Sequence, residues 1–208
     1  MELSYFRKLT SRTPYTIKIR KIVGQTITSP TLKAQTELAR SWYQKGKKRK
    51  ANNVKILMPA FAPAAILEGG KTKDNVIDLT GLCFLDIDHI SESDAESTVK
   101  ALSNDPFTRI ASVSVSGKGV HLLVRYTVEF GDYDNPFISS PDKLRELYKG
   151  VFIQLANHYT KKLGHQVDMC GENAERLCII SHDPNIYYNE ESATYVYDIV
   201  NDVIINAI

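Results

Sequence analysis

Cysteine is scarce in this sequence, with only three among 208 residues. Cys83, Cys170 and Cys178 are an odd number, and they form neither a CxxC pair nor a Cys/His pattern with zinc-site spacing. The sequence therefore favours neither a disulfide framework nor a zinc finger. We expect the thiols to stay reduced, as in a cytoplasmic protein.

Long apolar runs are also missing. Charged residues and Pro14 interrupt the start of the chain, unlike a signal peptide, and no later stretch approaches the roughly 18 apolar residues of a membrane span. The net charge of +2 is too small to indicate nucleic-acid binding by itself. We expect a soluble protein without a membrane partner, in which 43% apolar residues provide a substantial core.

The character of the sequence changes near Gly69 and Gly70. The part before them is the more basic, whereas the part after them alternates between strand and helix patterns. We therefore expect an N-terminal α/β lobe over residues 1–78 and a catalytic core over residues 79–208, which together form one domain. The apolar end at residues 200–208 suggests a piece of a longer protein.

The N-terminal part predicts one helix, one strand and one basic segment. Ser29 and Pro30 signal a helix start, and apolar residues follow at helical spacing until Gly46. Residues 54–58 predict a short buried strand, and residues 59–63 predict a loop. Between the predicted helix and the predicted strand lies a basic run of Lys47, Lys48, Arg49 and Lys50. Such a run is commonly a solvated face favoured by the helix dipole, and contact with a nucleic-acid backbone is the alternative.

The second part predicts an α+β fold. The expected elements are a strand at 82–87, a helix from a Ser93/Glu96 capping box to residue 104, strands at 109–116 and 120–126, a long helix from Pro141 to Gly164, and strands at 177–180 and 195–200. This order is typical of a split βαβ sheet with its helices on one face.

Two aspartates end the first of these strands. Asp86 and Asp88 are two residues apart, so they project from the same face of a strand. Their carboxylates repel each other, and a hard divalent cation such as Mg²⁺ would relieve this repulsion while binding substrate phosphates. The alternative is a strand that simply ends in a polar loop.

The predicted hairpin contains a second candidate element. Gly117 and Gly119 allow backbone N–H groups to approach an anion, Lys118 adds a positive charge, and His121 can donate to a phosphate oxygen. The element joins two strands and lacks the spacing of a Walker loop. An ordinary glycine hairpin with an incidental histidine is the alternative.

A third acid and an arginine follow the long helix. Asp168 could complete a metal site begun by the two strand aspartates. Arg176 enters the next apolar strand, where a guanidinium could grip a phosphate. A structural ion pair of Arg176 with Asp168 or Glu175 is equally compatible with the spacing.

Three segments carry a resemblance when they are taken in order. FLDIDHI, SVSGKGVH and QVDMCGENAERLCIISHDPNIYYN resemble the three motifs of the archaeo-eukaryotic primase and primase-polymerase superfamily. They are most similar to VirE-like N-terminal domains of mobile elements, which precede helicase-type modules. The resemblance covers about residues 54 to 190.

The resemblance implies a fold and a reaction. It implies an RRM-like sheet with an added N-terminal lobe, and transfer of nucleotides from nucleoside triphosphates to a 3′ hydroxyl on a single-stranded DNA template. Asp86, Asp88 and Asp168 would hold Mg²⁺ or Mn²⁺. The residues expected to bind the nucleotide are Ser116, Gly117, Lys118, His121 and Arg176.

Two other functions remain open on the sequence. The same fold could be a catalytically weak nucleic-acid or nucleotide-binding module attached to a helicase-type protein, because a fold does not establish an activity. An apolar strand that ends in DxD also resembles a phosphohydrolase site, but the later lysine and acidic pair of such a site are not evident.

Overall fold

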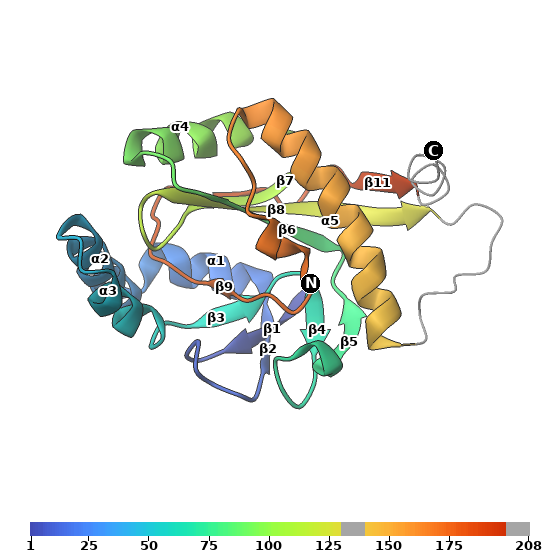
Figure 1. Cartoon of the computed structure of the whole chain (residues 1–208), viewed down its shortest axis with the longest axis horizontal. Coiled ribbons are helices and arrows are strands. Elements are labelled where there is room, and N and C mark those ends of the chain that lie inside the picture. Colours follow the sequence, from blue (N-terminus) through green and yellow to red (C-terminus); the bar gives the residue numbers. More distant parts are fainter. Residues whose placement is uncertain (130–139, 199–208) are drawn as a thin grey trace.

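The computed structural model describes residues 1–129 and 140–198, which form an α+β structure (Figure 1). Within these residues the chain has five α-helices, and its sheets are mainly antiparallel. None of these helices combines the length and the apolarity that a membrane crossing requires. The apolar end at residues 200–208 lies outside the described residues, as do the last two residues of the strand predicted at 195–200.

The central sheet carries the strands predicted at 82–87, 109–116, 120–126 and 195–200, together with β10, which was not predicted. Its members are β6 (Leu82–Asp88), β7 (Thr108–Val113), β8 (Gly119–Glu129), β10 (Tyr187–Tyr188) and β11 (Tyr195–Asp198). The long strand β8 pairs antiparallel with β6 and β7 and parallel with β11. The register places Asp86 opposite His121, so the first and second sequence motifs meet on adjacent strands.

Helices α4 (Glu92–Leu102) and α5 (Pro141–Leu163) cover one face of this sheet, as predicted (Figure 1). Alternate residues of β6, namely Cys83, Leu85 and Ile87, lie in one apolar cluster with Phe152 of α5. Gly164 ends α5 in the left-handed conformation. The predicted cap of α4 was wrong by two residues.

The hydroxyl of Ser91 caps α4, accepting a 3.0 Å hydrogen bond from the backbone N–H of Asp94. Ser93 instead lies within the first turn of the helix, where its hydroxyl is 2.9 Å from that of Ser91. Serine occurs at both positions, so the local pattern alone does not select the correct cap.

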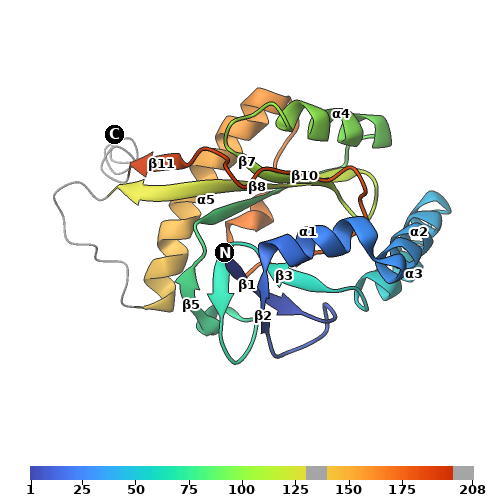
Figure 2. The same ribbon diagram turned by 180° about the vertical axis from the view of Figure 1, so that it is seen from behind.

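The other face of the central sheet packs against the N-terminal elements. A four-stranded sheet, ordered β2-β1-β3-β9, consists of β1 (Glu2–Phe6), β2 (Tyr15–Lys18), β3 (Ala60–Ala62) and β9 (Cys178–Ile179). Helix α1 (Ile19–Thr28), which the sequence analysis missed, lies between the two sheets (Figure 2). Leu82 and Phe84 of β6 share an apolar cluster with Ile22 of α1. Cys83, Leu85 and Ile87 of β6 thus face the helices α4 and α5, whereas Leu82 and Phe84 face these N-terminal elements.

The strand predicted at residues 54–58 is wrong. Helix α2 (Pro30–Gln44) is followed by α3 (Lys48–Lys55), and the chain then turns. The apolar side chains at this turn do not alternate, because Ile56 and Leu57 are both largely exposed while Met58 is fully buried. A strand with one buried face requires alternation.

The loop predicted at residues 59–63 is also wrong in part, because it contains β3. The small side chains of this strand are completely buried, and β9 pairs with it from the far end of the chain. The strand predicted at 177–180 thus exists, but it belongs to the first sheet. The remaining elements are β4 (Ala65–Leu67), β5 (Val76–Leu79) and the short 3₁₀ helices at Lys73–Asn75 and Met169–Glu172. The division of the chain at residue 78 stays a prediction.

Candidate functional site

Three aspartates from two segments meet at the end of β6. Asp86 and Asp88 project from the face opposite α5, as the strand period requires. Val167 forms an isolated antiparallel bridge with Ile87, and the backbone N–H of Asp168 donates to the carbonyl oxygen of Asp86 over 2.7 Å. One carboxylate oxygen from each aspartate lies within 4.8 Å of the others. Asp86, Asp88 and Asp168 therefore form the cluster that the sequence predicted.

Asp86 is the buried member of this cluster. Its residue exposure is 8%, and among the described residues its Oδ1 atom has no hydrogen-bond donor. Burial raises the pKa of Asp86 to about 6, although the nearby Arg176 opposes the rise. Burial, and then the charge of Asp86, also raises the pKa of Asp88. A carboxylate oxygen buried without a donor is costly unless a cation accompanies it.

The three aspartates fit a hard divalent cation. They offer only oxygen ligands, on a strand end and an adjacent loop, and such ligands suit Mg²⁺ and Mn²⁺ better than zinc. The orphaned Oδ1 of Asp86 supplies an observation that a simple polar strand end would not explain.

Arg176 provides the positive charge next to the cluster. Its Nη2 atom lies 3.1 Å from Oδ2 of Asp168 and 3.7 Å from Oδ2 of Asp86. Glu175 instead pairs with Arg145, over 3.1 Å. Of the two ion pairs that the sequence left open, the structure thus contains the one with Asp168.

His121 lies across the strand pair from Asp86, with Nε2 3.8 Å from Oδ1 of that residue. Burial lowers the pKa of His121 to about 4, so the imidazole is neutral at pH 7. Its Nδ1 is 3.3 Å from Sγ of Cys178, a thiol whose pKa burial raises. A protonated thiol can donate to Nδ1. With the thiol as the donor, the ring proton is on Nε2, which faces Asp86; the carbonyl oxygen of Ile179, 3.8 Å from Sγ, is the other acceptor for the thiol.

The hairpin between β7 and β8 forms one side of the site. Oγ of Ser116 accepts a 3.1 Å hydrogen bond from the backbone N–H of Lys118. Gly117 has a φ of 76°, which few other residues adopt, and a Cβ atom there would lie 3.4 Å from Nε of Arg40. A Cβ atom at Gly119 would lie 2.6 Å from the carbonyl oxygen of Ile87 and 2.7 Å from Oδ1 of Asp88. Glycine at residue 119 thus allows β8 to approach the acidic cluster.

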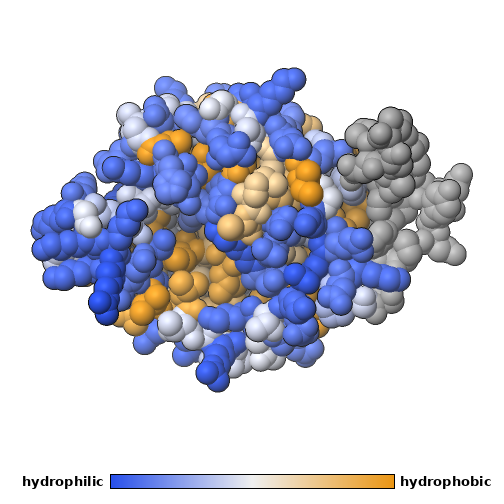
Figure 3. Space-filling model, in the orientation of Figure 1, coloured by the Kyte–Doolittle hydropathy of each residue, from blue (hydrophilic) through white to orange (hydrophobic). Residues whose placement is uncertain are grey.

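A cleft of about 700 Å³ opens over these residues. Asp168 does not line this cleft, but its carboxylate contacts Arg176, and Arg176 does line it. The predicted site residues in its lining are Asp86, Asp88, Ser116, Lys118, His121 and Arg176. The floor also has an apolar part, and Figure 3 shows an apolar recess where Figure 1 places β9.

Sequence reasoning missed the wall that α2 and α3 contribute to this cleft. Tyr43, Asn52 and Lys55 line it, and of the basic run only Lys48 does. Lys47 and Lys50 instead place their Nζ atoms 5.6 and 4.5 Å from the ring centre of Trp42. Arg49 is exposed and is not part of the lining.

His89 directly follows the acidic strand and also lines the cleft. Its φ of 62° is the only positive value among the described residues other than glycine. Strained backbone conformations of this kind concentrate at functional sites. The backbone conformation of His89 is therefore a further indication that the cleft around Asp88 is a functional site.

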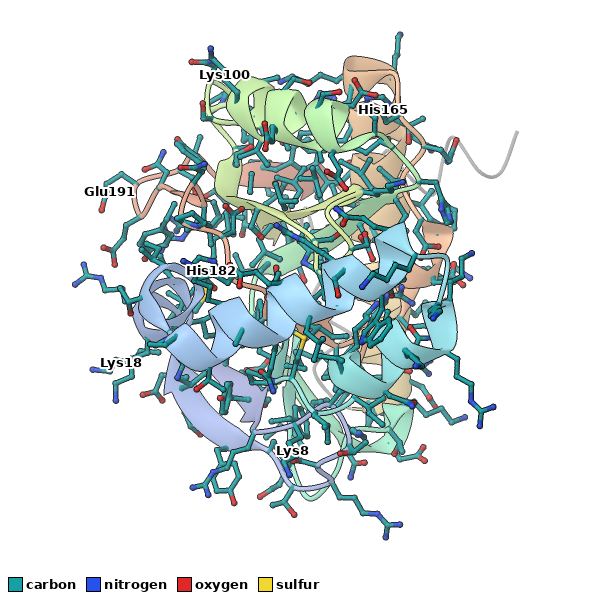
Figure 4. The ribbon with its side chains drawn as sticks, turned by 90° about the vertical axis from the view of Figure 1, so that its left-hand side faces the viewer. Lys8, Lys18, Lys100, His165, His182 and Glu191 are labelled. Carbon is teal, nitrogen blue, oxygen red and sulfur yellow. The ribbon has the colours of Figure 1, made fainter. Side chains whose placement is uncertain are left out.

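His182 lies away from the acidic cluster. It lines a second cleft of about 680 Å³ between α2, α4 and the segment that leads to β10. Figure 4 shows His182 beside α2 and Lys100 on α4 above it. The backbone N–H of His182 donates to Oγ1 of Thr36 over 2.9 Å, which anchors this segment to α2.

A family model described as BT4734-like, N-terminal domain, matches residues 53–188, which is more than half of the chain. The chain belongs to the BT4734-like N-terminal domain family. No curated protein and no solved structure matches it. The matched range of the BT4734-like domain includes the three aspartates, His121 and Arg176, together with Lys55, but it does not include Tyr43 and Lys48. The family description names no activity.

Proposed function

We propose that this BT4734-like domain is a metal-dependent nucleotidyltransferase of the primase-polymerase type. It would add nucleotides from nucleoside triphosphates to a 3′ hydroxyl on a single-stranded DNA template. In this proposal the central sheet is the RRM-like catalytic sheet, and α4 and α5 are the helices on its covered face. The acidic cluster lies on the opposite face, where Asp86 and Asp88 line the cleft.

One observation carries the proposal. Three carboxylates converge within 4.8 Å, and the most buried of them, that of Asp86, has an oxygen with no hydrogen-bond donor among the described residues. The cleft beside them is also lined by Lys118, His121 and Arg176. The acids suit a divalent metal, whereas Lys118, His121 and Arg176 suit phosphate oxygens. Both sets of groups are required to bind a metal-nucleotide complex.

Asp86, Asp88 and Asp168 would hold the metal. When bound, Mg²⁺ or Mn²⁺ supplies charge neutralisation at the phosphates and activation of the attacking hydroxyl. The buried position of Asp86 excludes water from one side of this centre, which strengthens its electrostatic interactions.

His121 would act as a neutral hydrogen-bond donor to the triphosphate. The contact of Nδ1 with Cys178 orients the ring, so that Nε2 points towards the carboxylates, where it would donate to an arriving phosphate oxygen in the tautomer protonated at Nε2. Lys118 on the hairpin adds a full positive charge at the same cleft. Ser116, which lines the cleft, accepts a hydrogen bond from the backbone N–H of Lys118 and so holds the turn.

A second function is favoured by a specific observation, the contact of Arg176 with two of the aspartates. A guanidinium in this place can neutralise the acids without a metal. The domain would then be a catalytically weak module that binds nucleotides or nucleic acid for a helicase-type protein. In the catalytic proposal Arg176 turns from Asp168 to a phosphate oxygen when the metal binds.

A transfer assay separates the two functions. The protein is incubated with Mg²⁺ or Mn²⁺, labelled nucleoside triphosphates and a single-stranded template, with and without a primer. The test variant is Asp86→Asn/Asp168→Asn, and the matched control is Asp74→Asn, which removes an exposed carboxylate from a 3₁₀ helix elsewhere. Metal-dependent extension that survives in the control but falls at least 100-fold in the test variant is expected. Absence of any transfer by the wild-type protein, despite metal and nucleotide binding, would support the binding module instead.

The proposal extends to the setting of the domain. A polymerase of this kind would serve the replication of a mobile element, in the cytoplasm and next to a helicase-type domain. Products formed without a primer would identify the domain as a primase, whereas products that require one would identify it as a polymerase.

A further inference from the structure

Helix α3 presents a basic face to the cleft. Lys48, Asn52 and Lys55 are spaced at i, i+4 and i+7, which places them on one side of the helix, and all three line the cleft. We refer to these three residues as the α3 stripe. It extends about 10 Å along the helix axis. Among the described residues neither lysine takes part in an ion pair, so both charges are available to a ligand.

The other faces of α3 are already committed. Ala51 is fully buried, and Lys47 and Lys50 lie over the ring of Trp42 on α2. The basic run is therefore split by the helical geometry. Part of it stabilises the packing of α2 and α3, and Lys48 alone joins Asn52 and Lys55 at the cleft.

Lys48, Asn52 and Lys55 line the same cleft as Asp86 and Asp88. Lys48 begins the helix and Lys55 ends it, so the stripe spans the whole length of α3 along this cleft. A chain of phosphates that follows the stripe would reach the acidic cluster.

Aromatic and apolar surfaces accompany the stripe. The hydroxyl of Tyr43 donates to Oδ1 of Asn52 over 3.2 Å, which holds the tyrosine at the cleft and leaves the amide NH₂ of Asn52 as a donor. Leu177 and Ile179 line another side of the same cleft. A basic track next to an aromatic ring and apolar walls is the combination that binds single strands, because the charges follow the backbone while the bases stack.

We propose that the α3 stripe and Tyr43 bind a single-stranded nucleic acid and guide it to the acidic cluster. This inference rests on the proposed nucleotidyl transfer for its biological sense, but it concerns strand binding and can be tested separately. Lys48 and Lys55 contact phosphates of the strand, Asn52 donates to the backbone between them, and a base stacks on Tyr43. The triphosphate binds at the hairpin with Lys118.

The test compares two double variants that remove equal charge from neighbouring positions. Lys48→Gln/Lys55→Gln removes the lysines of the stripe, and Lys47→Gln/Lys50→Gln removes those that lie over Trp42. Glutamine keeps a helix propensity similar to that of lysine, and circular dichroism with thermal melting verifies that both variants fold. Binding of a fluorescent oligothymidylate is measured by anisotropy between about 50 and 200 mM salt, the range in which strand binding changes steeply.

The expected result is specific to the stripe variant. Loss of two phosphate contacts should lower the slope of log K against log salt by about 1.4, and should weaken binding roughly 10- to 30-fold at 0.1 M salt. The control variant should keep the wild-type slope. An equal loss in both variants, or a stripe variant with wild-type slope and affinity, would overturn the inference. Failure of the wild-type protein to bind the strand at low salt would also overturn it.

Two further measurements separate this inference from the proposed function. The Asp86→Asn/Asp168→Asn variant should keep strand binding and lose transfer, because it alters the acidic cluster and leaves the stripe intact. Strand binding that depends on the stripe, without any transfer by the wild-type protein, would leave the inference standing and reject the proposed function. Transfer in which the stripe variant shows an altered KM only for the nucleotide would reject the inference and keep the function.

Discussion

The backbone N–H of Asp168 donates to the carbonyl oxygen of Asp86 over 2.7 Å, and this bond joins the third acid to the strand that carries the first two. The two residues are 82 positions apart in the chain. Because the bond is between main-chain atoms, substitution of either side chain leaves it in place. Variants of the aspartates should therefore change the charge of the cluster without dispersing the segments that form it.

Asp86→Asn should stabilise the metal-free protein. The substitution replaces a buried carboxylate, whose Oδ1 has no donor among the described residues, by a neutral group of the same shape. The expected gain in the free energy of unfolding at pH 7.5 is on the order of 1 to 3 kcal/mol. Urea unfolding in the presence of a chelator measures it.

The same comparison has a defined pH dependence. Burial raises the pKa of Asp86 to about 6 in the folded protein, from an ordinary value near 4. Ionisation of Asp86 therefore opposes folding above pH 6, and this cost disappears once the carboxyl is protonated in both states. The advantage of Asp86→Asn should be full above pH 7 and should fade between pH 6 and pH 4. An advantage that grows as the pH falls would contradict the assignment.

Arg176→Gln should make the stability of the protein depend more strongly on divalent metal. Removal of the guanidinium leaves the aspartates without their nearest positive charge, so the metal-free variant should melt several degrees below the wild-type protein. Mg²⁺ at millimolar concentration should recover most of this loss, since the cation replaces the missing charge. Differential scanning calorimetry with and without Mg²⁺ tests this. A loss that Mg²⁺ does not reduce would indicate that Arg176 has a purely structural role.

Gly119→Ala should destabilise the protein by about 1 to 3 kcal/mol, because the new methyl group would collide with the main chain of β6 and with Asp88. Gly24→Ala is the matched control. Nothing lies within 4 Å of a Cβ atom at Gly24, which lies within helix α1, so this variant should gain about 0.5 to 1 kcal/mol. Chemical denaturation of both variants measures the contrast, and equal effects would show that the approach of β8 to Asp88 is not constrained.

The long helix and the strand pair β7–β8 were predicted correctly from local signals. Pro141 and Gly164 bound the long helix, and the apolar spacing between them is that of one buried face. The pairing of Asp86 with Asp88 follows from the period of a strand. Their proximity to His121 depends on the pairing of β6 with β8, which brings together residues that α4 and β7 separate in the chain.

The features that depend on distant contacts were missed. Nothing local indicates that β9 joins the N-terminal sheet or that α2 and α3 form a wall of the cleft. The prediction of a strand at residues 54–58 also obscured the role of Lys55, which ends a helix. Had residues 48–55 been interpreted as a helix, the spacing of Lys48, Asn52 and Lys55 would have identified the basic face before the structure was known.

The central claim is that the aspartates form a metal centre that binds nucleotide, and Mn²⁺ binding tests it most directly. Free Mn²⁺ is titrated by electron paramagnetic resonance against the wild-type protein and Asp86→Asn/Asp168→Asn, with and without a nucleoside triphosphate. We expect the wild-type protein to bind Mn²⁺ more tightly when nucleotide is present, and the variant to lose at least tenfold in affinity for Mn²⁺. Equal Mn²⁺ binding by the two proteins would show that the aspartates do not form a metal centre.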